Sequence, residues 1–233
     1  MNARRPTVKE MQSARERILA LTEPVFAGLG RLGAAFVHAG LERRDRPFDQ
    51  EDAWDLMAPT VKDVVRGSSL VRGAGVAVDD GSGEAVSMAW WIRDEDEVLP
   101  KKHVTNPQSD SFYDVSHLRW FTEPMASGEA SILGPYVDSW GTDDLTLTAA
   151  IPVDGTSQRL GVAAADLATE RFIEAVDQVL GATWIDVLLD RDDRVIVARD
   201  PDLDTGTRMA TIGRGVVRRE AVEPHGWSLA LLG

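Results

Sequence analysis

The sequence predicts an α+β fold, in which a long N-terminal helix packs on an antiparallel sheet and a small second α/β module follows. Apolar residues recur at three- and four-residue steps from about Thr7 to Leu41, which is the pattern of an amphipathic helix. From Gly73 onward the pattern changes to the period of two that is typical of strands. Helices that are segregated from an antiparallel sheet, rather than alternating with its strands, indicate the α+β class.

The first half of the chain supplies the helices and the start of the sheet. The first helix contains Pro24, where a kink is expected, and a second helix is expected from Gln50 to Arg66. Gly73 to Val78 and Ala85 to Ile92 read as two strands of a hairpin, joined by a turn rich in Asp and Gly. Residues 94–111 are charged, contain two prolines and are expected to form a loop.

The second half continues the sheet and adds the smaller module. Arg119 to Ala126 is expected to form a short helix, and Thr169 to Leu180 a longer one. Strands at about 131–137, 144–152 and 158–167 complete a five-strand meander with the hairpin. Three further strands belong to the second module: Trp184 to Leu189, Arg194 to Ala198 and Trp227 to Leu232. We place the N-terminal helix at 1–49, a central sheet module at 50–168 and a small C-terminal module at 169–233.

Composition excludes several classes of partner and chemistry. The formal charge of −13 argues against nucleic acid and anionic membrane surfaces, because both need a basic face. The chain has no cysteine, which excludes disulfides, thiolate chemistry and cysteine-based zinc sites. Its 4 histidines are scattered without metal-ligand spacing. Neither a metal nor a cofactor is therefore expected.

Neither a leader nor a membrane segment is expected near the N-terminus. The basic residues there are not followed by an apolar core and a small-residue cleavage site, as in a signal peptide. The run from Val25 to Leu41 contains Arg31 and His38 and is shorter than the ~20 apolar residues of a membrane helix. The chain as written is expected to be cytoplasmic, whereas a receptor fragment of the same sequence would be extracytoplasmic.

The most informative stretch for function runs from Phe112 to Tyr136 and contains both tyrosines of the chain, Tyr113 and Tyr136. Arg119, Trp120, Phe121 and Glu123 lie between them. Aromatic rings beside carboxylates suit a small cation, because ring faces and anions both attract positive charge. No nucleophile–base pair or phosphate-binding glycine loop accompanies this cluster. The sequence therefore favours a binding domain over an enzyme.

Strand periodicity extends this cluster to further residues. Tyr136 and Asp138 are two positions apart and share one face of a strand. Asp166 ends an apolar strand, where its carboxylate would need a cation or donors as partners. If the segment around Trp120 and Phe121 is extended, these neighbours face opposite sides, and Trp120 is then the expected pocket residue and Phe121 the core residue. Of the Trp90–Trp91 pair, Trp91 is taken as the pocket residue.

The order of elements, with the motifs YDVSHLRWF, ILGPYVD, LTAAIPV and GVAAADL, resembles the Cache family of ligand sensors, also called PDC sensors. The chain is similar to the double-Cache type and to its amino-acid- and amine-sensing branch. The resemblance covers residues 7 to 232 and is strongest from Phe112 to Leu167. It implies a PAS-like sheet that holds the ligand and a second, smaller sheet.

The resemblance also implies which residues hold the ligand. In register with the family motif are Tyr113, Trp120, Phe121, Tyr136, Asp138 and Asp166. Leu118 stands where the family has the arginine that pairs with the ligand carboxylate, and Arg119 follows one residue later. Arg119 would therefore contribute only if its side chain turns inward. The residues that would recognise an ammonium group are intact: Trp120, Tyr136, Asp138 and Asp166.

These implications give three hypotheses. In the first, the chain is a sensor domain that binds a small amine or amino-acid-like metabolite without catalysis, forms a homodimer through its N-terminal helix, and signals through a separate signalling or regulatory protein. In the second, it is a small-molecule enzyme that uses Asp138 or Asp166 as a general base. In the third, it is a dimeric scaffold with a vestigial pocket. The first is the leading hypothesis.

Overall fold

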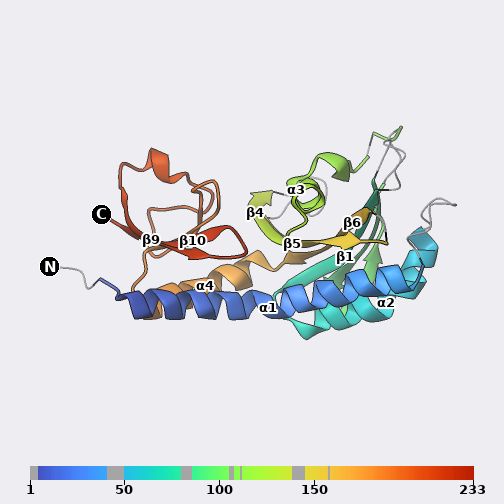
Figure 1. Cartoon of the computed structure of the whole chain (residues 1–233), viewed down its shortest axis with the longest axis horizontal. Helices are drawn as coiled ribbons and strands as arrows, with labels where there is room; N and C mark the ends of the chain where they lie inside the picture. Colours follow the sequence, from blue (N-terminus) through green and yellow to red (C-terminus); the bar gives the residue numbers. More distant parts are fainter. Residues whose placement is uncertain are drawn as a thin grey trace.

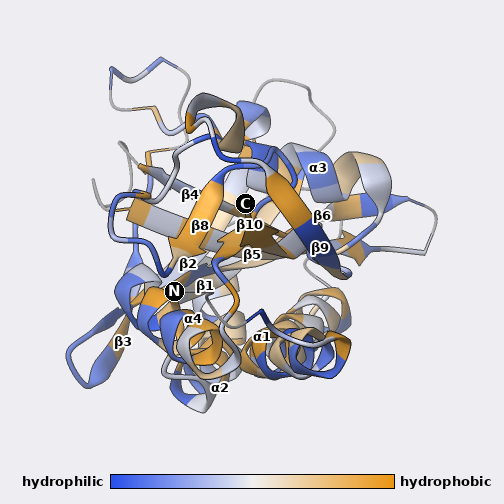
Figure 2. Ribbon diagram, turned by 90° about the vertical axis from the view of Figure 1, so that its left-hand side faces the viewer, coloured by the Kyte–Doolittle hydropathy of each residue, from blue (hydrophilic) through white to orange (hydrophobic). Residues whose placement is uncertain are grey.

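The computed structural model of the chain describes residues 5–40, 50–79, 86–104, 108–110, 112–137, 145–156 and 158–233. It has a long helix, a six-stranded antiparallel sheet and a smaller four-stranded sheet (Figure 1). The helices are α1 Val8–His38, α2 Gln50–Gly67, α3 Arg119–Ser127 and α4 Thr169–Thr183. The first, second and fourth lie on one side of the sheets, and α3 lies on the other side (Figure 2). This arrangement confirms the predicted α+β class.

α1 runs beneath both sheets and contacts α2, β5, β6, α4 and β9. It begins with a capping box: the Thr7 hydroxyl accepts from the Glu10 N–H at 3.2 Å, and the Glu10 carboxylate accepts from the Thr7 N–H at 2.8 Å. Among the described residues it is the one helix whose length and composition would also allow it to cross a membrane, a property that core helices share. Its buried face, from Met11 to Phe36, packs in the main hydrophobic core.

The larger sheet has the strand order β3-β2-β1-β6-β5-β4. The strands are β1 Val71–Asp79, β2 Val86–Asp94, β3 Glu97–Lys101, β4 Ser131–Val137, β5 Leu145–Asp154 and β6 Arg159–Leu167. β1 and β6 pair at the centre, with Ala74 opposite Ala165. The predicted five-strand meander is therefore wrong. These two strands are almost continuously buried, and such strands are stable only in the middle of a sheet that is covered on both faces.

Alternation along the central strands separates two cores. Ala163 and Ala165 face α1 and α2, whereas Val162 and Ala164 face α3. The core on the α3 side is small and rich in aromatic residues, because α3 covers only part of that face. The candidate site lies there.

The second module consists of α4 and a sheet of order β8-β7-β10-β9. Its strands are β7 Val187–Leu189, β8 Val195–Ala198, β9 Val216–Val222 and β10 Trp227–Leu232. His225, between β9 and β10, is buried against α1: its Nε2 lies 2.7 Å from Thr22 Oγ1, and its ring stacks on Phe26. This contact fixes the second module to the long helix.

Two strands were not predicted. β3 occupies residues 97–101, within the segment expected to be a loop, and β9 occupies 216–222, where no element was expected. The predicted helices are confirmed; α3 starts at the predicted residue and ends one residue later, and α4 extends three residues further. The proposed module boundaries at 49 and 168 stay predictions.

Candidate functional site

A small pocket lies on the α3 side of the larger sheet. It is lined by Met88, Trp90, Lys101, His103, Tyr113, Trp120, Tyr136 and Asp166. The residues come from β2, β3, β4, β6, α3 and the segments around them. Its volume is about 10 Å³, close to the space that a single water molecule needs. A ligand larger than water can therefore enter only if the walls move.

A chain of hydrogen bonds orients the Asp166 carboxylate. Thr148, which pairs with Asp166 across β5 and β6, donates from its hydroxyl to Asp166 Oδ1 at 2.8 Å. Tyr136 Oη lies 2.7 Å from Thr148 Oγ1. Because the single Thr148 hydroxyl proton goes to Asp166, the Tyr136 hydroxyl is the donor in the second bond. The Thr148 and Tyr136 hydroxyl groups thus form a short relay that orients the Asp166 carboxyl group.

Aromatic rings form most of the remaining wall. The rings of Trp90 and Trp120 are 6.0 Å apart and tilted by 49°. Trp90 fits over β1 because Gly75 has no side chain: a Cβ there would lie 2.7 Å from Trp90 Cε3 and 2.1 Å from the Ala89 carbonyl oxygen. Tyr113 packs against His103 at 5.0 Å between ring centroids. The pocket therefore joins one oriented carboxylate to several ring faces, groups that attract an organic cation, and Lys101 adds a basic side chain to the same wall.

His103 adds a neutral polar group to this pocket. Burial, followed by the charge of Lys101, lowers the pKa of His103 to about 4. The imidazole is therefore uncharged at neutral pH and adds no positive charge that would repel a bound cation. Its Nδ1 is buried without a hydrogen-bond partner among the residues that the structure describes.

Arg119 points away from this pocket. Its Nε donates to Glu123 Oε1 at 2.6 Å and its Nη1 to Asp192 Oδ2 at 2.9 Å, and Arg191 Nη1 donates to the other Glu123 oxygen at 2.7 Å. The pKa of Arg119 is raised, first by the hydrogen bond to Glu123 and also by the bond to Asp192, against the opposing effect of burial. This network joins α3 to the turn between β7 and β8.

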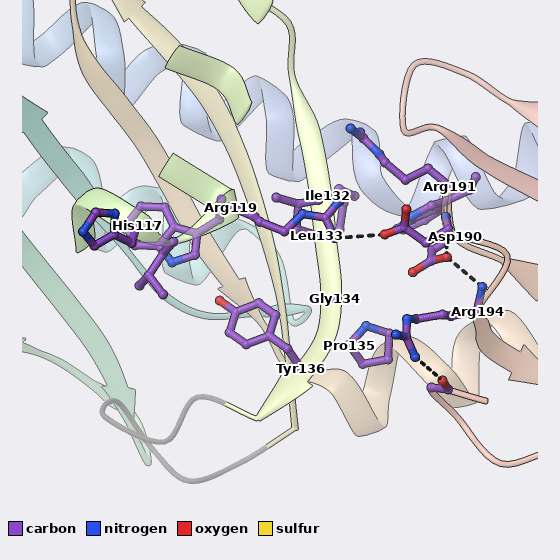
Figure 3. Close-up of a pocket in the computed structure, with 15 residues that line it drawn as sticks. His117, Arg119, Ile132, Leu133, Gly134, Pro135, Tyr136, Asp190, Arg191 and Arg194 are labelled. Atoms are coloured by element: carbon purple, nitrogen blue, oxygen red, sulfur yellow. Dashed lines mark hydrogen bonds and ion pairs between the residues drawn. The ribbon is translucent and has the colours of Figure 1, made fainter. Parts of the chain in front are cut away.

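A larger cavity of about 440 Å³ lies on the other side of Trp120 and Tyr136, between the two modules (Figure 3). Figure 3 shows Arg119 directed across it toward the β7–β8 turn, which carries Asp190, Arg191 and Arg194. Trp120 and Tyr136 line both this cavity and the pocket at Asp166. Leu118, which the sequence resemblance aligns with an arginine, lines the larger cavity only.

No protein-family model matches the sequence. Solved structures of similar shape are ligand-binding or extracellular domains of bacterial receptors. The extracellular domain of a histidine kinase, soHK1S-Z6, has a TM-score of 0.62 and 15% identity, over 97% of this chain and 91% of that one. The ligand-binding domain of Pseudomonas fluorescens chemoreceptor CtaA, in complex with L-valine, has a TM-score of 0.62 and 12% identity, over 96% and 93%. That of Pseudomonas aeruginosa PctC, in complex with GABA, has a TM-score of 0.56 and 19% identity, over 95% and 96%.

The chain shares the fold of these domains. Within it, four of the predicted site residues gather around the small pocket: Tyr113, Trp120, Tyr136 and Asp166. Asp138 lies outside the described residues. The structure also adds residues to this pocket that were not predicted, namely Met88, Trp90, Lys101, His103 and the supporting Thr148. Only strand parity could have found Trp90, and only a correct assignment of β3 could have found Lys101.

Three predicted site residues lie elsewhere. Trp91 is on the opposite face of β2 from Trp90 and is buried in the core beneath the helices. Phe121 is a core residue of α3 that packs edge-on against Trp120, at 6.3 Å between ring centroids. Arg119 is held by Glu123 and Asp192, as described above. The assignment of Trp91 to the pocket is therefore wrong, because alternation states that two neighbours face opposite sides but not which side is which.

Proposed function

We propose that the chain is a ligand-binding sensor domain that recognises a small amine or amino-acid-like metabolite in the pocket at Asp166 and does not transform it. The observation that carries this proposal is the pairing of the Asp166 carboxylate, oriented by Thr148, with the rings of Trp90, Trp120 and Tyr113. A desolvated ammonium group bound there would donate a charge-assisted hydrogen bond to the Asp166 carboxylate and would also gain cation–π attraction from the rings.

The ammonium group is the proposed common feature of the ligands. The solved chemoreceptor domains that resemble this chain were crystallised with L-valine, with GABA and with L-arginine. Each of these ligands has an amine and a carboxylate. In this chain Leu118 and the outward Arg119 leave the carboxylate without an arginine in the pocket. A ligand carboxylate would therefore pair with Lys101 rather than with an arginine, so the binding test includes amines with and without a carboxylate.

Ligand entry must rearrange the pocket, and this supplies a signal. A pocket of about 10 Å³ is far below the roughly 300–1,000 Å³ of ordinary ligand sites. Trp120 is the wall that α3 contributes, and α3 is joined to the second module through Arg119 and Glu123. Displacement of Trp120 by a ligand would therefore shift α3 and, through these ion pairs, the second module. A ligand that favours the opened pocket shifts the population toward that arrangement.

The signal is proposed to pass to a separate signalling protein or to the signalling part of a receptor. The similar structures come from chemoreceptors and a histidine kinase, and the structure from the histidine kinase is that of its extracellular domain. We therefore propose an extracytoplasmic position in place of the cytoplasmic one first expected. A homodimer through α1 is part of the same proposal, and sedimentation velocity of the purified chain tests it directly.

A thermal-shift screen followed by calorimetry tests the ligand class. The panel pairs amines with neutral or acidic analogues: isobutylamine, putrescine, GABA, L-valine and isobutyrate. We expect at least one amine to raise the melting temperature, and Asp166→Asn to abolish that shift while Glu174→Gln, an exposed carboxylate on α4, leaves it unchanged. An amine that binds Asp166→Asn as tightly as the wild type would refute the assignment of the pocket.

Mass spectrometry of the bound amine separates the sensor from the enzyme. A sensor returns the amine with its mass unchanged after prolonged incubation with the protein. Conversion of the amine into a new species that requires Asp166 would establish the general-base alternative instead. A scaffold with a vestigial pocket would show no saturable binding to any member of the panel.

A further inference from the structure

The larger cavity, between the modules, has the size of a ligand site in its own right. Its volume of about 440 Å³ falls within the roughly 300–1,000 Å³ of small-molecule sites. Both modules contribute walls, since Leu133 and Pro135 come from β4 and Arg194 comes from the β7–β8 turn (Figure 3). The proposed amine pocket uses none of these three residues.

The two sides of the cavity differ in chemistry. The side formed by the larger sheet and the start of α3 has an apolar surface of Leu118, Leu133 and Pro135, with His117 and Arg119 beside it. The side formed by the β7–β8 turn is charged, with Asp190, Arg191 and Arg194. A molecule that fills this space would need an apolar body and one charged end. The charged groups of the cavity that already have partners cannot bind that end, so the groups that remain available decide whether it is an anion or a cation.

The carboxylates on the charged side are already engaged. Asp192 pairs with Arg119 at 2.9 Å, and Arg119 and Arg191 both pair with Glu123 of α3, which lies outside the cavity lining. Asp190 Oδ1 accepts from the backbone N–H groups of Asp192 and Arg194, both at 2.8 Å, and burial raises the pKa of this carboxyl group. These contacts leave little capacity for a cationic ligand.

Donors, in contrast, remain available. Arg194 Nη1 donates to the Gly206 carbonyl oxygen at 3.1 Å, and Arg194 forms no ion pair with a carboxylate among the residues that the structure describes. A guanidinium group has five N–H donors arranged to match a carboxylate. Trp227 also lines the cavity, and its indole N–H is buried without an acceptor in the described part of the chain.

We propose that this cavity is a second binding site, for a small organic acid whose carboxylate pairs with Arg194 and whose apolar body packs on Leu133 and Pro135. The site is independent of the pocket at Asp166 in its chemistry, because it selects an anion where the other selects a cation. It shares with that pocket only the walls formed by Trp120 and Tyr136.

Calorimetric titration of the full chain with phenylacetate and isovalerate tests the proposal, with phenylacetamide as the uncharged match of the first. We expect saturable binding of at least one acid, and binding of the amide that is about tenfold weaker or more, because a charge-assisted bidentate pair is lost. Asp166→Asn should leave the affinity for the acid unchanged, which separates this site from the proposed amine pocket.

Three arginine variants locate the site. Arg194→Gln should weaken binding of the acid about tenfold or more, and Arg194→Lys should fall between it and the wild type, because lysine keeps the charge but loses the planar fork. Arg214→Gln is the matched control, since Arg214 pairs with Asp200 outside the cavity. Circular dichroism verifies that each variant is folded. The proposal is overturned if no acid binds saturably below about 10 mM, or if folded Arg194→Gln and Arg194→Lys bind it like the wild type.

Discussion

Arg119 in α3 and Asp192 in the β7–β8 turn form an ion pair of 2.9 Å that joins the two modules. The same guanidinium group also pairs with Glu123, which in turn holds Arg191. Arg119, which the sequence suggested as a ligand-binding residue, therefore links the two modules instead. Its partner is 73 positions away along the chain, which no local pattern reveals.

Arg119→Gln should have a small effect on stability and almost none on amine binding. The Arg119 side chain is 56% exposed, and exposed ion pairs contribute about 1 kcal/mol or less. We expect the free energy of unfolding to fall by no more than that in a urea titration, and the affinity for an amine to stay within about twofold. A loss of affinity confined to ligands with a carboxylate would show instead that Arg119 turns inward.

Thr148→Val should weaken amine binding without changing the shape of the pocket. Thr148 is 1% exposed, and valine has the same shape but cannot donate to Asp166. An unsatisfied partner of this kind costs about 1–3 kcal/mol, so the dissociation constant should rise roughly fivefold or more.

Tyr136→Phe is the matched variant for this relay. It removes the outer hydroxyl only and leaves Thr148 bonded to Asp166, so its effect in the same calorimetric titration should be smaller. Equal losses in the two variants would contradict the order of the relay.

Gly75→Ala should destabilise the fold. Its Cβ would lie 2.1 Å from the Ala89 carbonyl oxygen and 2.7 Å from Trp90, so β1 and β2 would have to shift, at a cost of about 1–3 kcal/mol. Gly30→Ala is the control, because this exposed position in α1 has nothing within 4 Å of the added atom. There the substitution should raise the melting temperature, since alanine favours a helix by about 0.8–1 kcal/mol over glycine. Thermal denaturation of both variants should show a lower melting temperature for Gly75→Ala and a higher one for Gly30→Ala.

Acid should weaken the fold through His225. Thr22 Oγ1 donates to the Leu19 carbonyl oxygen, so it accepts from His225 Nε2–H, and the deprotonated Nδ1 is buried without a partner in the described structure. Burial lowers the pKa of His225 from 6.5 to about 4. The unfolded chain therefore binds a proton more readily between these values, and the stability present above pH 6.5 is lost as the pH falls toward 4.

Urea titrations between pH 7 and pH 4 measure this loss. The contribution of His225 is of the order of 3 kcal/mol across that window. His225→Gln cannot titrate, so its stability should vary less with pH, whereas His117→Gln, at an exposed histidine, should follow the wild type. His103 acts with the same sign, which explains why the dependence should be reduced rather than removed. Parallel pH profiles of wild type and His225→Gln would contradict the assignment.

Sequence periodicity was sufficient to predict the helices and the apolar strands, because apolar residues repeat along one face of each of these elements. It failed at both edge strands that carry charges. β3 includes Pro100, which argues against a central strand but is tolerated at the edge of a sheet. β9 alternates half-buried and exposed positions with Arg218, Arg219 and Glu220 among them, and so lacks an apolar run.

The sequence could identify a pocket residue only where the direction of its side chain follows from that of a neighbour on the same strand. Trp90 and Trp91 were known to face opposite ways, but the side covered by the helices decides which one meets Asp166. The argument that assigned Trp120 to the pocket and Phe121 to the core assumed an extended segment, whereas both residues lie in α3, as the helix prediction had it. Lys101 enters the pocket because β3 pairs with β2, a long-range fact that places it opposite Trp90.

Trp120 and Tyr136 form a single partition between the pocket at Asp166 and the larger cavity. A partition has two sides, so a ligand that moves it from one side changes the space on the other. Thermodynamic linkage then requires reciprocity: whatever factor an amine imposes on the affinity for an acid, the acid imposes on the affinity for the amine. With both proposed sites occupied, the domain would report a ratio of two metabolites of opposite charge rather than the concentration of one.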